Sequence, residues 1–274
     1  MTASGNFIPF GSSRVCFYRW GKGDKLLLCF HGYGETAASF AFLEEALGNE
    51  FTILAVDLPF HGGTEWRETL PFTAEQLLSI LETLLAETAI PPETPWYLMG
   101  YSMGGRIALS LLAAVPERIA RLVLLAPDGL RLNPWYWLAT QTGPGRLLFR
   151  YTMHHPGWFF FLLRAGNALK LVNPSIYKFV SCYIDDRQVR ENLYTRWTAL
   201  RTFRPHIGAV KAIIRRRQLP VRILYGRFDR IILAKRGEEF RKGIEPYCHL
   251  TVLSAGHQLL QISYLPALLS LLKG

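Results

Sequence analysis

Apolar runs of strand length recur along the chain and alternate with longer stretches whose apolar residues fall at helical spacing. The mainly apolar runs occupy residues 25–30, 51–56, 96–99, 121–126, 221–225 and 250–253. A more mixed β-like segment precedes them at residues 14–20. Strands that are apolar at nearly every position are typical of parallel sheets buried on both faces. The pattern therefore predicts an α/β fold in which helices cover both faces of a mostly parallel sheet.

Helical spacing is clearest after Thr73, where leucine and isoleucine at positions 77, 78, 80, 81, 84 and 85 form one face. Further helices are predicted at residues 36–47, with Thr36 as N-cap, and at 104–115, 211–217, 234–242 and 259–272. The regular alternation breaks between residues 127 and 220. Proline and glycine at positions 134, 143–145 and 156–157 divide that segment into short helical pieces.

The sequence Gly100-Tyr101-Ser102-Met103-Gly104 joins the apolar run 96–99 to the helix at 104–115. A Gly-x-Ser-x-Gly at a strand-to-helix junction is a nucleophile elbow, a strained turn that raises a serine hydroxyl above the sheet. A Cβ atom at the glycine positions would collide with the adjacent strand or helix. Ser102 is therefore the candidate nucleophile.

A serine nucleophile needs a base and an acidic group that orients the base. In a parallel sheet, such groups lie in loops at the carboxyl ends of strands. Asp229 follows the run 221–225, and His257 follows the run 250–253. We predict His257 as the base and Asp229 as the acid, with Asp128, after the preceding run, as the alternative acid.

These motifs, together with His31-Gly32-Tyr33-Gly34 and the loop 57–63, make the chain resemble the α/β-hydrolase superfamily, in its serine-nucleophile, esterase- and lipase-like branch. The resemblance implies an eight-stranded sheet in a core of residues 1–127 and 208–274, with residues 128–207 inserted as a helical cap (lid). It also implies an oxyanion hole made by the backbone N–H groups of Tyr33 and Met103. His31 and His61 are expected to shape loops by hydrogen bonding, and Asp57 to anchor one.

Charge and aromatic residues are concentrated in the predicted cap. Residues 127–220 hold 15 Lys/Arg and 4 Asp/Glu, within a chain of net charge +10. The cap's apolar residues are predicted to select a hydrophobic acyl group, with Trp135, Trp137, Trp158 and Phe159 as candidate substrate contacts. The positive charge fits a solvated outer face, attraction of an anionic substrate, or contact with an anionic membrane. No nucleic-acid-binding module accompanies it.

The predicted reaction is hydrolysis of a carboxylic ester or thioester through an acyl-Ser102 intermediate. The alternatives are a lyase resembling the pyruvate-eliminating synthase of the menaquinone pathway, a C–C bond hydrolase, and a non-catalytic ligand receptor. Arg106 belongs to the pattern of that lyase, so it is a candidate substrate contact; otherwise it caps or solvates its helix. No metal site is predicted, because the four cysteines lack metal-ligand or redox spacing, and no cofactor is expected.

No apolar run reaches the length of a membrane-spanning helix, and residues 1–10 lack the features of a signal peptide. A cytoplasmic location is therefore expected. The sequence carries no signal for an oligomeric state.

Overall fold

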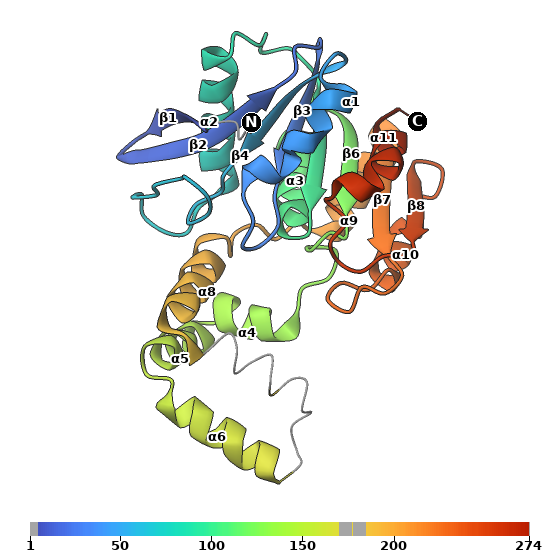
Figure 1. The fold of residues 1–274 in the computed structure, drawn as a ribbon. Helices are drawn as coiled ribbons and strands as arrows, with labels where there is room; N and C mark the ends of the chain where they lie inside the picture. Colours follow the sequence, from blue (N-terminus) through green and yellow to red (C-terminus); the bar gives the residue numbers. More distant parts are fainter. Residues whose placement is uncertain (1–4, 170–176, 178–184, 274) are drawn as a thin grey trace. The chain divides into compact units, whose positions relative to one another are not determined.

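The computed structural model describes residues 5–169, 177 and 185–273 (Figure 1). The chain divides into two compact units, which we call the sheet unit (Met1–Arg131 with Thr202–Gly274) and the helical unit (Leu132–Arg201). The helical unit falls a few residues inside the segment 128–207 expected from the sequence. Among the described residues, no helix is long and apolar enough to cross a bilayer.

The sheet unit is built on one eight-stranded sheet in the order β1-β2-β4-β3-β5-β6-β7-β8. Six of these strands, β4, β3, β5, β6, β7 and β8, are parallel to one another. Strand β2 pairs antiparallel with β4, and β1 pairs antiparallel with β2. The predicted α/β fold with a mostly parallel sheet is therefore confirmed. The strands are β1 (Asn6–Phe10), β2 (Ser13–Trp20), β3 (Lys25–Phe30), β4 (Phe51–Val56), β5 (Trp96–Tyr101), β6 (Ile119–Leu125), β7 (Val221–Gly226) and β8 (Cys248–Leu253).

The edge strand β1 was not predicted from the sequence. Only Ile8 of its five residues is buried, so the strand shows neither a continuous apolar run nor a clean alternation. Pro9 is accommodated because proline is tolerated on edge strands, where one side of the backbone needs no partner.

Helices pack on both faces of the sheet, with α1 and α11 in front and α2 and α9 behind it in Figure 1. Helix α3 follows β5 and packs against both α2 and α9. The helical segments of this unit are η1 (Ala37–Leu43), α1 (Glu44–Leu47), α2 (Ala74–Glu87), α3 (Met103–Ala114), η2 (Pro116–Arg118), α9 (Ile207–Arg217), α10 (Lys235–Arg241), η3 (Ile262–Tyr264) and α11 (Leu265–Lys273).

Two helix predictions are corrected by the structure. Residues 37–43 form the 3-10 helix η1, whose buried residues Ala37, Phe40 and Leu43 recur at the three-residue spacing of that geometry. Thr36 makes no side-chain cap there. The last helix begins at Leu265 rather than near 259, because Pro266 is compatible only with the first turn of an α-helix.

Helix α2 matches its prediction closely. Thr73 accepts a hydrogen bond from the backbone N–H of Gln76, and the Gln76 side chain accepts one from the Thr73 N–H, which completes a capping box. Its buried residues include Leu77, Ile80 and Leu84, which form the predicted face.

The helical unit contains α4 (Pro134–Gln141), α5 (Gly143–His154), α6 (Gly157–Ala168) and α8 (Arg187–Ala199). Asn133, Thr142 and Asp186 cap three of these helices with their side-chain oxygens. Aromatic contacts join α4, α5 and α8, since the ring of Trp197 lies 5.0 Å from that of Tyr136 and 5.6 Å from that of Phe149. These short helices follow the proline and glycine positions noted in the sequence.

Candidate active site

Ser102 occupies a sharp turn between β5 and α3. Its backbone has φ 48° and ψ −113°, outside the regions that L-residues ordinarily populate. The turn is held by hydrogen bonds from the Ser102 N–H to Leu125 O at 2.8 Å and from the Asp128 N–H to Ser102 O at 2.8 Å. The neighbouring strand β6 and the loop after it therefore fix the strained conformation.

The glycines of the motif are required by close packing, as the sequence predicted. A Cβ atom on Gly104 would overlap the backbone carbonyl of Phe30 in β3. A Cβ atom on Gly100 would lie 2.5 Å from the carbonyl oxygen of Gly104. Helix α3 can therefore approach β3 and β5 this closely only where side chains are absent.

The side chains of Ser102, His257 and Asp229 form a continuous chain of hydrogen bonds. Nε2 of His257 lies 3.0 Å from Oγ of Ser102, and Nδ1 lies 2.7 Å from Oδ2 of Asp229. A carboxylate accepts hydrogen bonds, so Nδ1 carries the proton and Nε2 is left to accept from the serine hydroxyl. These three residues follow β5, β8 and β7, at one edge of the sheet.

Asp229 is buried and held rigidly. Its Oδ1 accepts hydrogen bonds from the backbone N–H groups of Ile231 at 2.8 Å and Ile232 at 2.9 Å, leaving Oδ2 directed at His257. These two hydrogen bonds fix the position of the carboxylate. His257 is more accessible than its partner, with 14% of its side chain exposed.

Asp128, the alternative acid, has other partners. Its Oδ2 lies 3.6 Å from Nε of Arg106, and its Oδ1 accepts from the Gly129 N–H at 2.8 Å. Arg106 is buried on α3, with 5% of its side chain exposed, so it is not a solvated helix residue as one interpretation of the sequence held. The structure thus brings Asp229, rather than Asp128, to His257.

The two backbone groups predicted to bind an oxyanion belong to Met103, which directly follows Ser102, and to Tyr33, which follows the strand next to β5. Met103 is the first residue of α3, and the first N–H groups of a helix have no partner within it. The helix also carries a partial positive charge at this end. Tyr33 lies in the loop after β3, where its ring packs edge-on against His61 with centroids 6.0 Å apart.

His31, His61 and Asp57 hold the surrounding loops, as expected. Nε2 of His31 accepts from the Leu58 N–H at 3.1 Å, and its Nδ1 contacts Gly32 O at 2.8 Å. The fully buried carboxylate of Asp57 accepts from the backbone N–H groups of Ala37 and Gly63. The ring of His61 lies 5.0 Å from that of His31.

A second group of polar side chains lies beside His257 and was not predicted from the sequence. The hydroxyl of Tyr101 donates to His257 O at 3.2 Å and to Oε1 of Gln258 at 3.0 Å. Burial raises the pKa of Glu35, while the Gly32 backbone, the charge of His257 and a hydrogen bond with Gln258 act to lower it. Tyr101 occupies the first variable position of the Gly-x-Ser-x-Gly motif, and Gln258 directly follows His257. These positions are the signals by which the sequence could have placed both residues at the site.

The predicted substrate contacts of the cap belong to the helical unit. Trp135 and Trp137 are 76% and 47% exposed, Trp158 is 36% exposed and Phe159 is half-buried. Their part in substrate binding stays a prediction. Within the described part of the chain, no group of three or more His, Cys, Asp or Glu residues could hold a metal ion.

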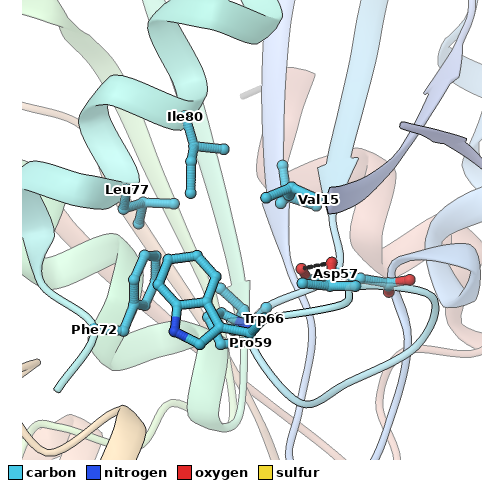
Figure 2. Close-up of a pocket in the computed structure, with 10 residues that line it drawn as sticks. Val15, Asp57, Pro59, Trp66, Phe72, Leu77 and Ile80 are labelled. Carbon is cyan, nitrogen blue, oxygen red and sulfur yellow. Dashed lines mark hydrogen bonds between the residues drawn. The ribbon is translucent and has the colours of Figure 1, made fainter. Parts of the chain in front are cut away.

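A small apolar pocket lies beside the loop after β4 and is separate from the triad residues. Figure 2 shows Trp66 and Phe72 on one side of it and Val15 and Asp57 on the other. The polar atoms of Asp57 are engaged by the loop, so the pocket offers mainly hydrocarbon surface. We assign it no role in the chemistry.

A family model described as "alpha/beta hydrolase fold" matches residues 25–258, which include all three triad residues. The chain belongs to the α/β-hydrolase family. The match spans most of the chain. Esterases and thioesterases are among the similar proteins, which supports an enzyme of the hydrolase class.

The uncharacterised hydrolase YugF of Bacillus subtilis is 25% identical over 242 residues, covering 86% of this chain and 84% of YugF. The pimeloyl-[acyl-carrier protein] methyl ester esterase of Aeromonas hydrophila is 33% identical over 137 residues, covering 48% of this chain and 49% of that protein. Other curated relatives are matched over about a third of their own length.

A similar solved structure is that of a probable hydrolytic enzyme from Pseudomonas aeruginosa PAO1. It has a TM-score of 0.69 and 18% sequence identity, and the match covers 99% of this chain and 95% of that one. At 18% identity, this similarity shows a shared fold and nothing about the reaction.

Proposed function

We propose that the protein is a serine hydrolase that cleaves a carboxylic ester or thioester through an acyl-Ser102 intermediate. The observation that carries the proposal is the hydrogen-bonded chain from Ser102 through His257 to Asp229. A nucleophile, a base and an orienting acid within hydrogen-bond distance form the arrangement used for acyl transfer on several unrelated folds.

Each residue has a defined part in the proposed reaction. His257 Nε2 removes the proton from Ser102 Oγ as the oxygen attacks the ester carbonyl, and Asp229 stabilises the resulting imidazolium. The backbone N–H groups of Tyr33 and Met103 donate to the oxyanion that develops. The imidazolium then protonates the leaving alcohol or thiol, and water attacks the acyl-enzyme with His257 again as base.

We also propose that the helical unit is the cap and that its apolar residues select the acyl group. Between residues 132 and 169 the exposed side chains include Trp135, Trp137 and Phe161, and the segment has three arginines and no acidic residue. A surface of this kind favours an apolar acyl chain and tolerates a negative charge on the substrate. The esterase from Aeromonas hydrophila acts on an acyl-carrier-protein-bound methyl ester, so monoesters of long dicarboxylic acids belong in a substrate panel.

The test is turnover of p-nitrophenyl esters graded by acyl length, with Ser102→Ala as the control. We expect medium-chain esters to be hydrolysed by the wild type and not by the variant. Pyruvate release from the menaquinone-pathway intermediate, or cleavage of a ring-fission dienone without ester turnover, would replace the esterase proposal by the lyase or the C–C hydrolase. Ligand binding without any turnover would indicate a receptor.

A further inference from the structure

The loop that carries the triad acid exposes a set of large apolar side chains. It runs from the end of β7 to the start of α10 (Figure 1). Phe228 is 65% exposed, Ile231 66% and Leu233 53%. By contrast, Asp229 and Ile232 point inward and are 4% and 5% exposed. The apolar surface therefore lies on the outer side of a segment whose inner side belongs to the proposed active site.

The exposure is fixed by the backbone of the loop. The Phe228 N–H donates to Ala255 O at 2.9 Å, and Oδ1 of Asp229 accepts from the two N–H groups of Ile231 and Ile232. Such an Asx-type turn holds the residues that follow it in one conformation. Because Ile232 is directed into the core, Ile231 and Leu233 on either side of it point outward.

Positively charged side chains alternate with these apolar ones. Arg227, Arg230 and Lys235 are exposed, and the sole acidic residue from 227 to 237 is the buried Asp229. From 227 to 237 the chain carries four Lys/Arg against this one acidic residue, and the exposed Glu238 and Glu239 follow on α10. We call the six exposed residues, Arg227, Phe228, Arg230, Ile231, Leu233 and Lys235, the β7–α10 patch.

We propose that the β7–α10 patch docks the protein on the surface of an anionic lipid membrane. Bulky apolar side chains at a loop tip enter the region between headgroups and acyl chains, while Arg and Lys bind the lipid phosphates. The alternation of the two types along one fixed loop serves both contacts at once. Charge favours lipid over a second copy of this chain, because two copies of a basic patch would repel each other.

Docking in this way would hold the edge of the sheet that carries Ser102 and His257 near a lipid surface. The inference does not depend on the proposed esterase activity, because binding involves no catalytic side chain.

The experiment is co-sedimentation with vesicles of equal parts phosphatidylglycerol and phosphatidylcholine, and with vesicles of phosphatidylcholine alone. Two variants test the patch: Phe228→Ser/Ile231→Ser/Leu233→Ser and Arg227→Gln/Arg230→Gln/Lys235→Gln. The matched control is Phe7→Ser/Leu70→Ser, which removes exposed apolar side chains elsewhere on the same unit. Ser102→Ala is expected to bind like the wild type.

We expect the wild type to bind the anionic vesicles and both patch variants to bind them at least tenfold more weakly. The charge variant should lose on the order of 100-fold, since each cation near an anionic surface contributes about 1 kcal/mol. Circular dichroism spectra and melting temperatures should remain at wild-type values in the patch variants, which shows that they are folded.

Equal binding to both vesicle types, or binding that the patch variants leave unchanged, would overturn the proposal. So would absence of wild-type binding. Light scattering that shows a dimer abolished by the patch variants, without vesicle binding, would assign the patch to a second copy instead. A membrane result of either kind leaves the test of Ser102 untouched.

Discussion

His257 and Asp229 are joined by the shortest side-chain contact of the proposed active site, with 2.7 Å between Nδ1 and Oδ2. The side chain of Asp229 is fully buried, and its other oxygen, Oδ1, accepts hydrogen bonds from two backbone N–H groups. The orientation of the imidazole is therefore determined by a group that cannot move independently of the loop after β7.

This pairing predicts different outcomes for the two candidate acids. Asp229→Asn should lower kcat by about 10⁴. The side-chain NH2 of asparagine donates a hydrogen bond where a carboxylate oxygen accepts one, so it favours the wrong tautomer of His257. Asp128→Asn should reduce kcat by less than tenfold, since Asp128 contacts Arg106 instead. Steady-state ester hydrolysis measures both. An equal loss in the two variants would contradict the assignment.

The elbow predicts a large loss of stability for Gly104→Ala. The added methyl group would overlap the Phe30 carbonyl, which belongs to a central strand and cannot move aside. We expect the free energy of unfolding to fall by at least about 3 kcal/mol in urea denaturation.

The matched control for Gly104→Ala is Gly157→Ala at the start of α6, where a Cβ atom meets nothing within 4 Å. That change should be neutral or stabilising by up to about 1 kcal/mol, because alanine favours the helix. If Gly104→Ala were as stable as this control, the steric account of the elbow would be wrong.

The half-buried position of Glu35 predicts a pH-dependent effect of its removal. Burial raises the pKa of Glu35 in the folded protein above its value in the unfolded chain. As pH rises through the unfolded pKa, the unfolded chain ionises first, so this residue lowers folding stability at neutral pH but not in acid.

Glu35→Gln should therefore raise the melting temperature relative to wild type near pH 7, and the difference should shrink below pH 4. Glu45→Gln, at an exposed position, controls for the general effect of removing one negative charge. A stability gain for Glu35→Gln that was equal at both pH values would show that ionisation of Glu35 is not its cause.

Three cysteines should react slowly with alkylating reagents in the native protein. Burial raises the pKa of Cys16 and of Cys248 to about 11, and burial raises the pKa of Cys29 as well. At pH 8 a rise from 9 to about 11 lowers the thiolate fraction roughly 100-fold. Peptide mapping after iodoacetamide treatment should show these sites modified in guanidinium and protected without it. Rapid native labelling of Cys248 would contradict the burial of its side chain.

Much of this architecture could be predicted from local sequence signals. The continuous apolar strands and the Gly-x-Ser-x-Gly junction place Ser102, Asp229 and His257 at the same edge of a parallel sheet. The capping box of Thr73 and Gln76 likewise depends on residues three apart.

What escaped prediction depends on contacts between distant segments. The Tyr101 hydroxyl meets Gln258 across 157 positions, and no local pattern indicates this pairing. Arg106 is buried beside Asp128, although its helical position alone suggested exposure. Strand β1 owes its existence to pairing with β2, since only Ile8 contributes to the core.

The central claim, that Ser102 is an activated nucleophile, is tested most directly by labelling with a fluorophosphonate probe followed by peptide mass spectrometry. The account predicts one stoichiometric adduct on Ser102 of the wild type, none on Ser102→Ala, and slow labelling of His257→Ala. A wild-type protein that stays unlabelled while a control esterase reacts, or an adduct on another residue, would contradict it.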